Sequence, residues 1–402
     1  MIPVGQRPKD LPNDHIVYQQ FPPTGPMQTA WLLTFNHALK KGLFITSAYF
    51  KAGPDRPWMK VLHKAEVSEI FVPYQSGTWR FRDFETYDFA LIPVAQQDAG
   101  RCGALLAPQP VRLRDGRQLN GPFVVRELTE KGVLWKRDRQ VYRGHKMTLW
   151  GTVGAENYNY IISYAFHDDG QIEFRGGATS QNWPQAPWEP HMHTLFWRVD
   201  IDINGSNNTV NVNRHLENTK QVNWQDCQLP FNGGVEGGLQ WNAPEFTTLH
   251  ITGEGMEKTH AGYMVLPLYR GVQRHQEPWT QWDAWVTKYR DEQETYRIQQ
   301  MGQIIRRESI MNQDLVLWVS TSLLHLPRNE DGRCARVVKA KNGREICNAW
   351  HGSAVAMWTG FDMKPHNIFP STPFTPGMSG PASWRTAYIP PRCPAPAQQK
   401  KR

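Results

Sequence analysis

The chain has 402 residues, of which 40% are hydrophobic and 20% are charged, so it can bury a large core and lacks the composition of a disordered protein. Its 45 Lys and Arg against 37 Asp and Glu give a net charge of +8, but no recognised nucleic-acid-binding motif accompanies that charge. Five cysteines without a CxxC pair exclude a disulfide-dense scaffold and a zinc ribbon. We expect no nucleic-acid partner and leave open a disulfide between Cys334 and Cys347.

Both ends of the chain have the composition of extended segments. Residues 1–28 are polar and contain several prolines, and they lack the apolar stretch of a signal peptide or a membrane anchor. Residues 374–402 are rich in proline and end in Lys400, Lys401 and Arg402. We expect a lead-in, one large domain over residues 29–373 and a basic arm or tail. A cytoplasmic protein without a membrane segment is favoured, and a processed or secreted form stays open.

Between these ends, runs of β-branched and aromatic residues alternate with Gly, Asn and Asp, a pattern typical of strands joined by tight turns. The pattern predicts an all-β domain. Its expected strands lie at residues 31–35, 42–50, 123–128, 160–166, 171–174, 195–203, 209–212 and 315–320. At residues 279–307 apolar side chains recur at helical spacing, so we expect a surface helix there.

Three histidines are candidate metal ligands. His191 and His193 open a predicted strand, and alternate residues of a strand share one face, so both imidazoles can reach one ion. His325 follows another apolar run and supplies a third imidazole. Three imidazoles without a thiolate suit copper or zinc, and ligand type alone does not choose between them. Each histidine taken alone is also consistent with an ordinary structural residue.

The segment from Gly151 to Tyr160 contains Thr152, Asn157, Tyr158 and Tyr160 in an order that resembles the signature of the copper amine oxidases, Thr-x-x-Asn-Tyr-acid-Tyr. That family has an HxH motif downstream and a third histidine in a segment ending His-x-Pro-Arg-x-Glu-Asp, which residues 325–331 reproduce. Its Arg-x-Asp-x-Asp and Lys-Pro-x-Asn-x-Phe runs are matched at residues 198–202 and 364–369. The resemblance covers roughly residues 28–373.

The resemblance implies a fold and a chemistry. The fold is a large β-sandwich with a few peripheral helices, the catalytic domain of the family without its usual N-terminal domains. Copper(II) is then held by the three histidines, and Tyr158, flanked by Asn157 and Tyr160, is the precursor of topaquinone. Such an enzyme oxidises a primary amine to an aldehyde with molecular oxygen and releases ammonia and hydrogen peroxide. A homodimer is also implied.

The family places a carboxylate base upstream of the quinone. Matching the Val-Pro-Tyr run at residues 72–74, Trp79 and Tyr87 to the family pattern selects Asp83, which would remove the α-proton of the substrate. Glu85 and Asp88 are close rivals. Without the resemblance, a surface ion pair with a neighbouring arginine, at position 80 or 82, would be expected for the selected aspartate.

Two aromatic residues and an acidic group take further implied roles. Tyr74 is expected to hydrogen-bond the quinone oxygen, and Phe81 to gate the substrate channel. A second metal site, of the structural calcium type, is implied near the HxH strand. Carboxylates with backbone carbonyls suit calcium, and a solvated acidic turn is the alternative. Its expected ligands are Asp200, Ile201, Asp202, Asp314 and Leu315.

The sequence departs from the family pattern in three places. Two extra residues separate Thr152 from Asn157, and Asn159 stands where the family has an acid. Cys102 matches one half of a family disulfide, but no cysteine occurs in the region before Trp135 where its partner is expected, which fits a reducing compartment. Two alternatives therefore stay open: a three-histidine metal hydrolase without a quinone, and a catalytically silent relative that acts as a binding protein.

Overall fold

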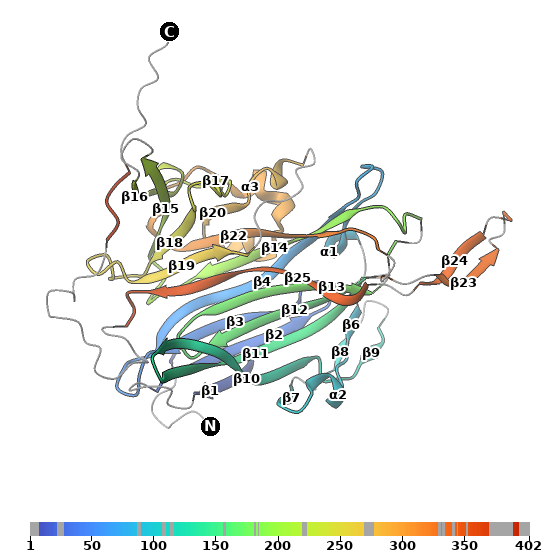
Figure 1. Ribbon diagram of the computed structural model, residues 1–402, viewed down its shortest axis with the longest axis horizontal. Coiled ribbons are helices and arrows are strands. Elements are labelled where there is room, and N and C mark those ends of the chain that lie inside the picture. Colours follow the sequence, from blue (N-terminus) through green and yellow to red (C-terminus); the bar gives the residue numbers. More distant parts are fainter. Residues whose placement is uncertain are drawn as a thin grey trace, which may run out of the picture.

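The computed structural model describes residues 8–21, 28–86, 90–106, 110–112, 116–155, 158–180, 182–183, 185–218, 223–268, 277–328, 331, 334–339, 342–343, 345–350, 353–369 and 389–393. Two large antiparallel sheets, packed against each other, make up most of this part of the chain (Figure 1). The all-β sandwich expected from the sequence is confirmed.

The first sheet has nine strands in the order β1-β2-β3-β4-β14-β22-β20-β17, and β5 pairs with β4. Its strands are β1 (His15–Gln20), β2 (Ala30–Ala38), β3 (Gly42–Lys51), β4 (Met59–Pro73), β5 (Arg80–Arg82), β14 (His191–Ile201), β17 (Gly237–Leu239), β20 (Ala284–Lys288) and β22 (Leu315–His325).

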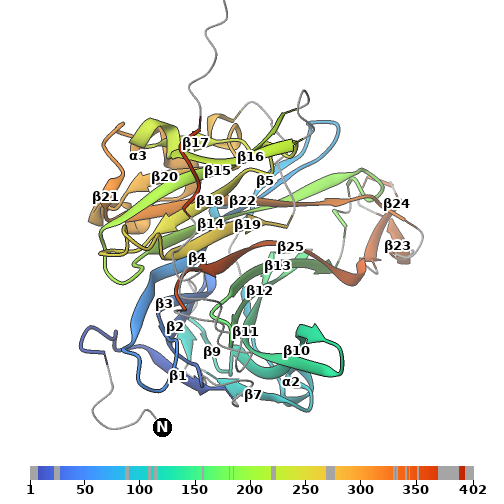
Figure 2. The same cartoon turned by 60° about the vertical axis from the view of Figure 1, so that its left-hand side comes forward.

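The second sheet has twelve strands in the order β16-β15-β18-β19-β25-β13-β12-β11-β10-β7, with β21 beside β15 and β6 beside β11. Figure 2 shows its outer strands β16, β15, β18 and β19 side by side. The strands are β6 (Ala90–Ile92), β7 (Gly103–Leu106), β10 (Val124–Arg137), β11 (Gln140–Ala155), β12 (Tyr158–His167), β13 (Ile172–Ser180), β15 (Asn208–Asn218), β16 (Asn223–Pro230), β18 (Thr248–Thr252), β19 (Gly262–Pro267), β21 (Met311–Gln313) and β25 (Ser353–His366).

Two hairpins stand outside these sheets, β8 (Val111–Arg112) with β9 (Gln118–Leu119), and β23 (Cys334–Lys339) with β24 (Glu345–Trp350). The helices are one turn long: α1 (Asp83–Thr86), α2 (Gln96–Ala99), α3 (Met301–Ile304) and the 3-10 turn η1 (Phe231–Gly234). No helix in the described part of the chain is long and apolar enough to cross a membrane.

The core lies between the facing sides of the two sheets, because alternate residues of each strand point inward. Trp197 of β14 is fully buried and packs edge to face, at a ring-centroid distance of 5.8 Å, on both Tyr164 of β12 and Phe174 of β13. Each of the eight strands expected from the sequence overlaps an observed strand of this sandwich. The β-branched and aromatic runs that predicted them are the runs that fill the core.

The helix expected at residues 279–307 is wrong. The structure divides this segment into the 3-10 turns η2 (Pro278–Thr280), η3 (Asp291–Thr295) and η4 (Ile298–Gln300), strand β20 and helix α3. Its apolar side chains at helical spacing pack instead on the outer face of the first sheet, where Trp279 meets Phe71 and Phe196 edge to face. Several short elements that cover one face of a sheet can therefore show the same spacing of apolar residues as a single helix.

One disulfide was not expected from the sequence. The structure pairs Cys227 with Cys393 across 166 residues of sequence. That disulfide fixes residues 389–393 beside β16. The side chains of Cys334 and Cys347, between which a disulfide was left open, lie outside the described part of the structure.

Candidate metal and catalytic centre

Strand pairing brings the three candidate ligands together. In the register of β14 with β22, His191 lies directly opposite His325, while His193 points to the same face two residues along. All three rings are buried, and one nitrogen of each lies within 4.8 Å of the others. The expected triad therefore forms, at the end of two neighbouring strands in the sandwich interior.

The other nitrogen of each ring is already occupied, which orients the triad. The Nδ1 atom of His191 lies 2.9 Å from the Glu189 carbonyl oxygen, and Nε2 of His325 lies 2.8 Å from a carboxylate oxygen of Asp331. Nδ1 of His193 lies 2.9 Å from the Tyr160 hydroxyl, and its Nε2 is buried without a hydrogen-bond partner in the described structure. A buried, unpaired imidazole nitrogen beside two converging ones fits a bound metal ion.

Burial disfavours the charged form of two of these rings, His191 and His193. It lowers the pKa of His191 to about 4 and the pKa of His193 well below its ordinary value, since neither charged imidazolium is solvated. Neutral imidazole is the form that binds a metal. The set of three nitrogen donors suits copper or zinc better than a hard cation.

Tyr158, the expected quinone precursor, opens β12 and is directed into the triad. Its hydroxyl lies 3.1 Å from His191 Nε2 and 2.8 Å from His325 Nδ1, and it donates to Asn182 Oδ1 at 2.8 Å. Burial raises the pKa of this phenol well above its usual range. Sequence reasoning missed Asn182, because nothing in the pattern of residues around it distinguishes it from a turn residue. Asn157, expected beside the tyrosine, lies outside the described residues.

Tyr160 links the metal triad to the expected base. Its hydroxyl donates to Asp83 Oδ2 at 2.7 Å and lies 2.9 Å from His193 Nδ1. Because one hydroxyl has a single proton, the second contact requires His193 to donate from Nδ1, which leaves Nε2 as the lone pair for a metal. The sequence placed Tyr160 beside the cofactor but did not indicate this bridge.

Asp83, the first residue of α1, is 5% exposed and lies in the interior. The surface ion pair considered for it is not what forms: Arg82 pairs with exposed Glu85 at 2.9 Å, and Arg80 pairs with Glu277. Glu85 is thus turned away from the triad, while the other rival, Asp88, and Tyr87 lie outside the described residues.

A second buried carboxylate fixes the backbone beside Asp83. Oε1 of Glu69, on β4, accepts the backbone N–H groups of Phe84 at 2.7 Å and Ile70 at 2.9 Å. Burial raises its pKa to about 7, and the guanidinium of Arg297 opposes that rise. Sequence reasoning missed Glu69, since an acid within a strand of otherwise buried residues carries no motif.

A small cavity of about 20 Å³ lies between Asp83 and Tyr158. This volume is close to that of one water molecule. Aromatic rings line and flank it: Phe81 packs on Trp183 at 5.2 Å and stacks on Trp79 at 6.2 Å between ring centroids. Tyr74, also lining the cavity, stacks on His191 at 4.3 Å. The surroundings of Asp83 and Tyr158 are therefore largely aromatic.

The expected second metal site also assembles. Carboxylate oxygens of Asp200, Asp202 and Asp314 lie within 4.8 Å of one another, and Ile201 pairs directly with Leu315 across β14 and β22. One oxygen of Asp200 and one of Asp314 are buried without a hydrogen-bond partner in the described structure.

Some of the charges at this acidic cluster favour cation binding and others oppose it. Burial raises the pKa of Asp200 well above its usual value and that of Asp314 to about 6, although the Arg198 guanidinium, 3.8 Å from Asp200, opposes the rise at Asp200. Lys60, 2.7 Å from Asp202, already supplies part of the opposing charge. The cluster thus has room for a hard cation but does not depend on one.

Comparison with known proteins agrees with this geometry. Residues 184–340 match the family model described as copper amine oxidase, enzyme domain. The chain is 20% identical to the peroxisomal copper-containing amine oxidase alpha 2 of Arabidopsis thaliana over 85% of its own length and 58% of that protein. It is 23% identical to copper amine oxidase 1 of Aspergillus niger over 67% of its length and 49% of that protein. The chain thus spans about half of the curated relatives it matches.

Solved structures have the same fold. The copper-containing benzylamine oxidase from Hansenula polymorpha matches with a TM-score of 0.66 at 17% identity, covering 86% of this chain and 60% of that one. The lysyl oxidase of Pichia pastoris matches with a TM-score of 0.66 at 16% identity, covering 86% and 52%. Residues 184–340 thus resemble the enzyme domain of the copper amine oxidases, and the fold of the chain resembles that of these solved structures.

Proposed function

We propose, from the relation of this chain to the copper amine oxidases, that it is a copper- and topaquinone-dependent oxidase of primary amines. The products are an aldehyde, ammonia and hydrogen peroxide. One observation carries the proposal: the Tyr158 hydroxyl lies within 3.1 Å of two imidazoles of the triad, and the buried carboxylate of Asp83 borders the same cavity.

His191, His193 and His325 would hold the copper ion through the three nitrogens that converge within 4.8 Å of one another, two of which lie within 3.1 Å of the Tyr158 hydroxyl. When bound, copper and the quinone derived from Tyr158 supply the redox chemistry, taking electrons from the amine and passing them to oxygen. The protein disfavours the charged forms of His191 and His193 by burial. Asp331 and Tyr160 fix the tautomers of His325 and His193.

Asp83 is assigned as the base that takes the proton from the carbon next to the amine nitrogen. Its carboxylate borders the cavity into which Tyr158 projects, and the Tyr160 hydroxyl, which donates to Oδ2 at 2.7 Å, orients it there. The Phe81–Trp183 wall excludes water around the carboxylate, which favours proton transfer within the site.

Amine-dependent release of hydrogen peroxide tests this assignment after aerobic loading with copper. Asp83→Asn should lower turnover by about 10²- to 10⁴-fold and leave copper binding intact. Glu85→Gln, two residues away and on the surface, is the matched control and should keep the wild-type rate. Full activity in Asp83→Asn would remove this residue from the mechanism. A colourless, copper-loaded protein that hydrolyses esters would favour a metal hydrolase instead.

We also propose that the acidic cluster binds calcium. One oxygen of Asp200 and one of Asp314 accept no hydrogen bond in the described structure and supply hard ligands, although the Arg198 guanidinium lies 3.8 Å from the oxygen of Asp200. Calcium should raise the melting temperature at pH 7.5, and less at pH 5, because Asp314, with a pKa of about 6, is then mostly protonated. Asp314→Asn should remove the effect, while Asp138→Asn, on the surface, should keep it. No calcium-dependent shift in the wild type would refute the site.

We further propose a homodimer. The β23–β24 hairpin projects from the sheets in Figures 1 and 2 and pairs with no other strand of the described structure. An isolated two-stranded hairpin is marginally stable in water, so such an arm gains from a partner surface. Sedimentation at twice the chain mass of 46.3 kDa supports the proposal, and sedimentation as a monomer at micromolar concentration refutes it.

A further inference from the structure

Glu69 is a fully buried acid that takes no part in the proposed chemistry. It lies on β4, opposite Phe196 of β14, and none of its surface is exposed. It is not among the described residues that line the cavity beside Tyr158. An ionised carboxylate in the interior costs stability unless hydrogen bonds compensate for the lost water. The groups that bond to this carboxylate therefore show which part of the molecule it holds in place.

One oxygen of this carboxylate holds the chain next to the assigned base. Glu69 Oε1 accepts the backbone N–H of Phe84 at 2.7 Å, and Phe84 directly follows Asp83. The same oxygen accepts the N–H of Ile70 at 2.9 Å. Because α1 has only four residues, its own hydrogen bonds cannot keep it in place. The bond from Phe84 to Glu69 therefore ties the start of α1, and with it the backbone of Asp83, to β4.

The second oxygen of Glu69 bonds to the 3-10 turn η4. Nε2 of Gln299 donates to Glu69 Oε2, although the two residues are 230 positions apart in the sequence. Two further bonds fix this turn on β4 beside the carboxylate. Ile298 donates its N–H to Ser68 Oγ at 2.9 Å, and the side chain of Arg297 donates to the Ser68 carbonyl oxygen at 2.8 Å. These contacts hold the turn, and through Gln299 the carboxylate, against the first sheet.

Arg297 adds a second contact to the residue that follows the base. Its guanidinium lies 5.7 Å from the centroid of the Phe84 ring, which is fully buried. The same positive charge favours the ionised form of Glu69 and opposes the rise in pKa that burial causes. Phe84 is thus fixed at its N–H by Glu69 and at its ring by Arg297.

Asp83 is therefore held both at its carboxylate and at its backbone. Tyr160 donates to the carboxylate, with 2.7 Å between the hydroxyl and Oδ2, and the bond from Phe84 to Glu69 holds the backbone. Proton transfer requires a base at hydrogen-bonding distance from the proton it takes, and a misplacement of about 1 Å can slow a reaction about 100-fold. A contact behind the backbone can therefore affect the rate without touching the substrate.

We propose that Glu69 is a positioning residue for the assigned base, Asp83. It sets the place of the base through the N–H of Phe84, and Gln299 of the η4 turn holds Glu69 itself. The inference rests on the proposed function, in which Asp83 takes the proton from the amine. It assigns to Glu69 no contact with the substrate, the quinone or copper.

Anaerobic reduction of the quinone by a primary amine measures the step in which the base acts. Benzylamine, tyramine and putrescine are tried with the wild type, and the fastest is used for all variants. Glu69→Ala should slow this reduction by at least about tenfold, because the Phe84 N–H loses its acceptor and the base is displaced. Copper affinity and the gain of mass at Tyr158 should match those of the wild type, since the triad keeps its contacts. A wild-type rate in Glu69→Ala would overturn the proposal.

Two variants separate positioning from a general loss of stability. Glu69→Gln keeps an oxygen that can accept the same N–H groups, so its rate should return to within about threefold of the wild type. Glu236→Ala removes another buried carboxylate, which accepts the backbone N–H groups of Lys288 at 2.9 Å and Arg306 at 2.6 Å and does not line the cavity. It should lower stability in urea as Glu69→Ala does, yet keep the wild-type rate. Equal slowing by both alanine variants would overturn the proposal.

Gln299→Ala keeps the test decisive if Glu69→Ala does not fold. Gln299 is only half-buried, and its substitution leaves both backbone N–H groups bonded to Glu69. Losing its bond to the carboxylate should slow the anaerobic reduction by about three- to tenfold, and an unchanged rate would overturn the proposal. A wild type that takes up copper and forms no quinone would instead contradict the proposed oxidase, so the two failures are distinguishable.

Discussion

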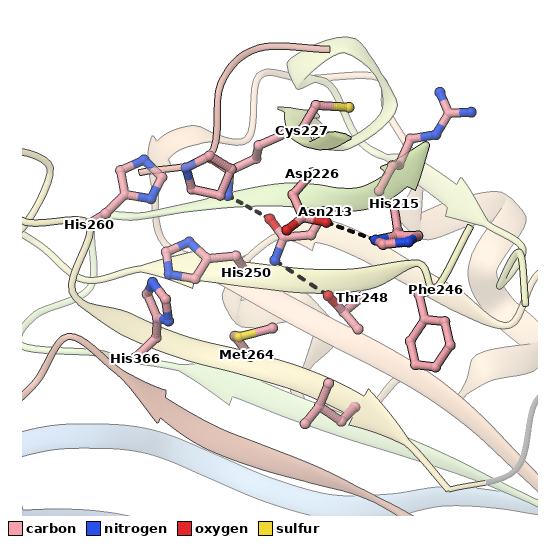
Figure 3. A pocket seen from close by; sticks show the side chains of 14 residues that line it. Asn213, His215, Asp226, Cys227, Phe246, Thr248, His250, His260, Met264 and His366 are labelled. Atoms are coloured by element: carbon pink, nitrogen blue, oxygen red, sulfur yellow. Dashed lines mark hydrogen bonds and ion pairs between the residues drawn. The ribbon is translucent and has the colours of Figure 1, made fainter. Parts of the chain in front are cut away.

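The sandwich contains two groups of three buried or half-buried histidines, and the groups differ in how their rings are oriented toward one another. The second group consists of His250, His260 and His366 (Figure 3). In the triad of His191, His193 and His325, one nitrogen of each ring converges within 4.8 Å while the other is held by a carbonyl, a carboxylate or a hydroxyl. In the second group, the ring of His250 stacks face to face on the ring of His260, with 5.0 Å between the ring centroids. Metal binding therefore depends on strand register and on outer hydrogen-bond partners, not on the number of histidines.

The largest effect that separates the two groups concerns copper affinity. His193→Phe removes the one ligand nitrogen that is buried without a partner, so Cu²⁺ affinity should fall by more than about 100-fold, beyond the loss typical of outer partners. His250→Phe, the same substitution in the other group, should leave it unchanged. Competition with a chelator measures both. Equal losses in the two variants would contradict the distinction between the groups.

A smaller loss of copper affinity is expected when the hydrogen-bond partner of a ligand histidine is changed. Asp331→Asn keeps the three ligands but replaces the carboxylate that lies 2.8 Å from His325 Nε2. Copper affinity should fall about 10- to 100-fold, because the ring loses its fixed orientation and part of its basicity. Competition with a chelator measures this loss of copper affinity as well. Asp226→Asn, on β16, is the control and should keep the wild-type affinity. Wild-type affinity in Asp331→Asn would show that register alone builds the site.

The smallest effect is the pH dependence of the free energy of unfolding that arises from His250. Burial and the neighbouring rings of His366 and His260 lower the pKa of His250 to about 3, against 6.5 when unfolded. Below pH 6.5 the unfolded chain binds more protons than the folded one, so the free energy of unfolding falls as pH falls toward 3. Between pH 7.5 and pH 5 this loss is at most about 2 kcal/mol.

His250→Phe cannot titrate, so its unfolding free energy should fall by that much less over the same interval. Urea unfolding at the two pH values measures the difference, and comparing each protein with itself removes the packing cost of the substitution. An identical pH dependence in both proteins would mean that His250 is protonated with little penalty.

Much of the sandwich could be predicted from the sequence, because alternation and aromatic runs report strands directly. The 279–307 helix failed because apolar spacing does not distinguish one helix from several short turns that cover the same sheet face. The disulfide between Cys227 and Cys393 could not be inferred, since its partners are separated by 166 residues and share no motif.

The residues of the candidate site were likewise only partly predictable from the sequence. The spacing of His191 and His193 indicates a shared strand face, and the apolar run before His325 made it the third candidate, which the register then places opposite His191. Tertiary partners such as Asn182 and Glu69 were missed, because a single hydrogen-bonding residue far away in sequence leaves no pattern. The roles proposed for Tyr158 and Asp83 stay predictions until tested.

Mass spectrometry of the intact protein, before and after aerobic incubation with Cu²⁺, shows whether Tyr158 becomes the quinone. We expect a gain of two oxygen atoms less two hydrogens, located by peptide mapping to Tyr158, and no gain in His193→Phe treated in the same way. An unchanged mass in a wild-type protein that has bound copper would contradict it.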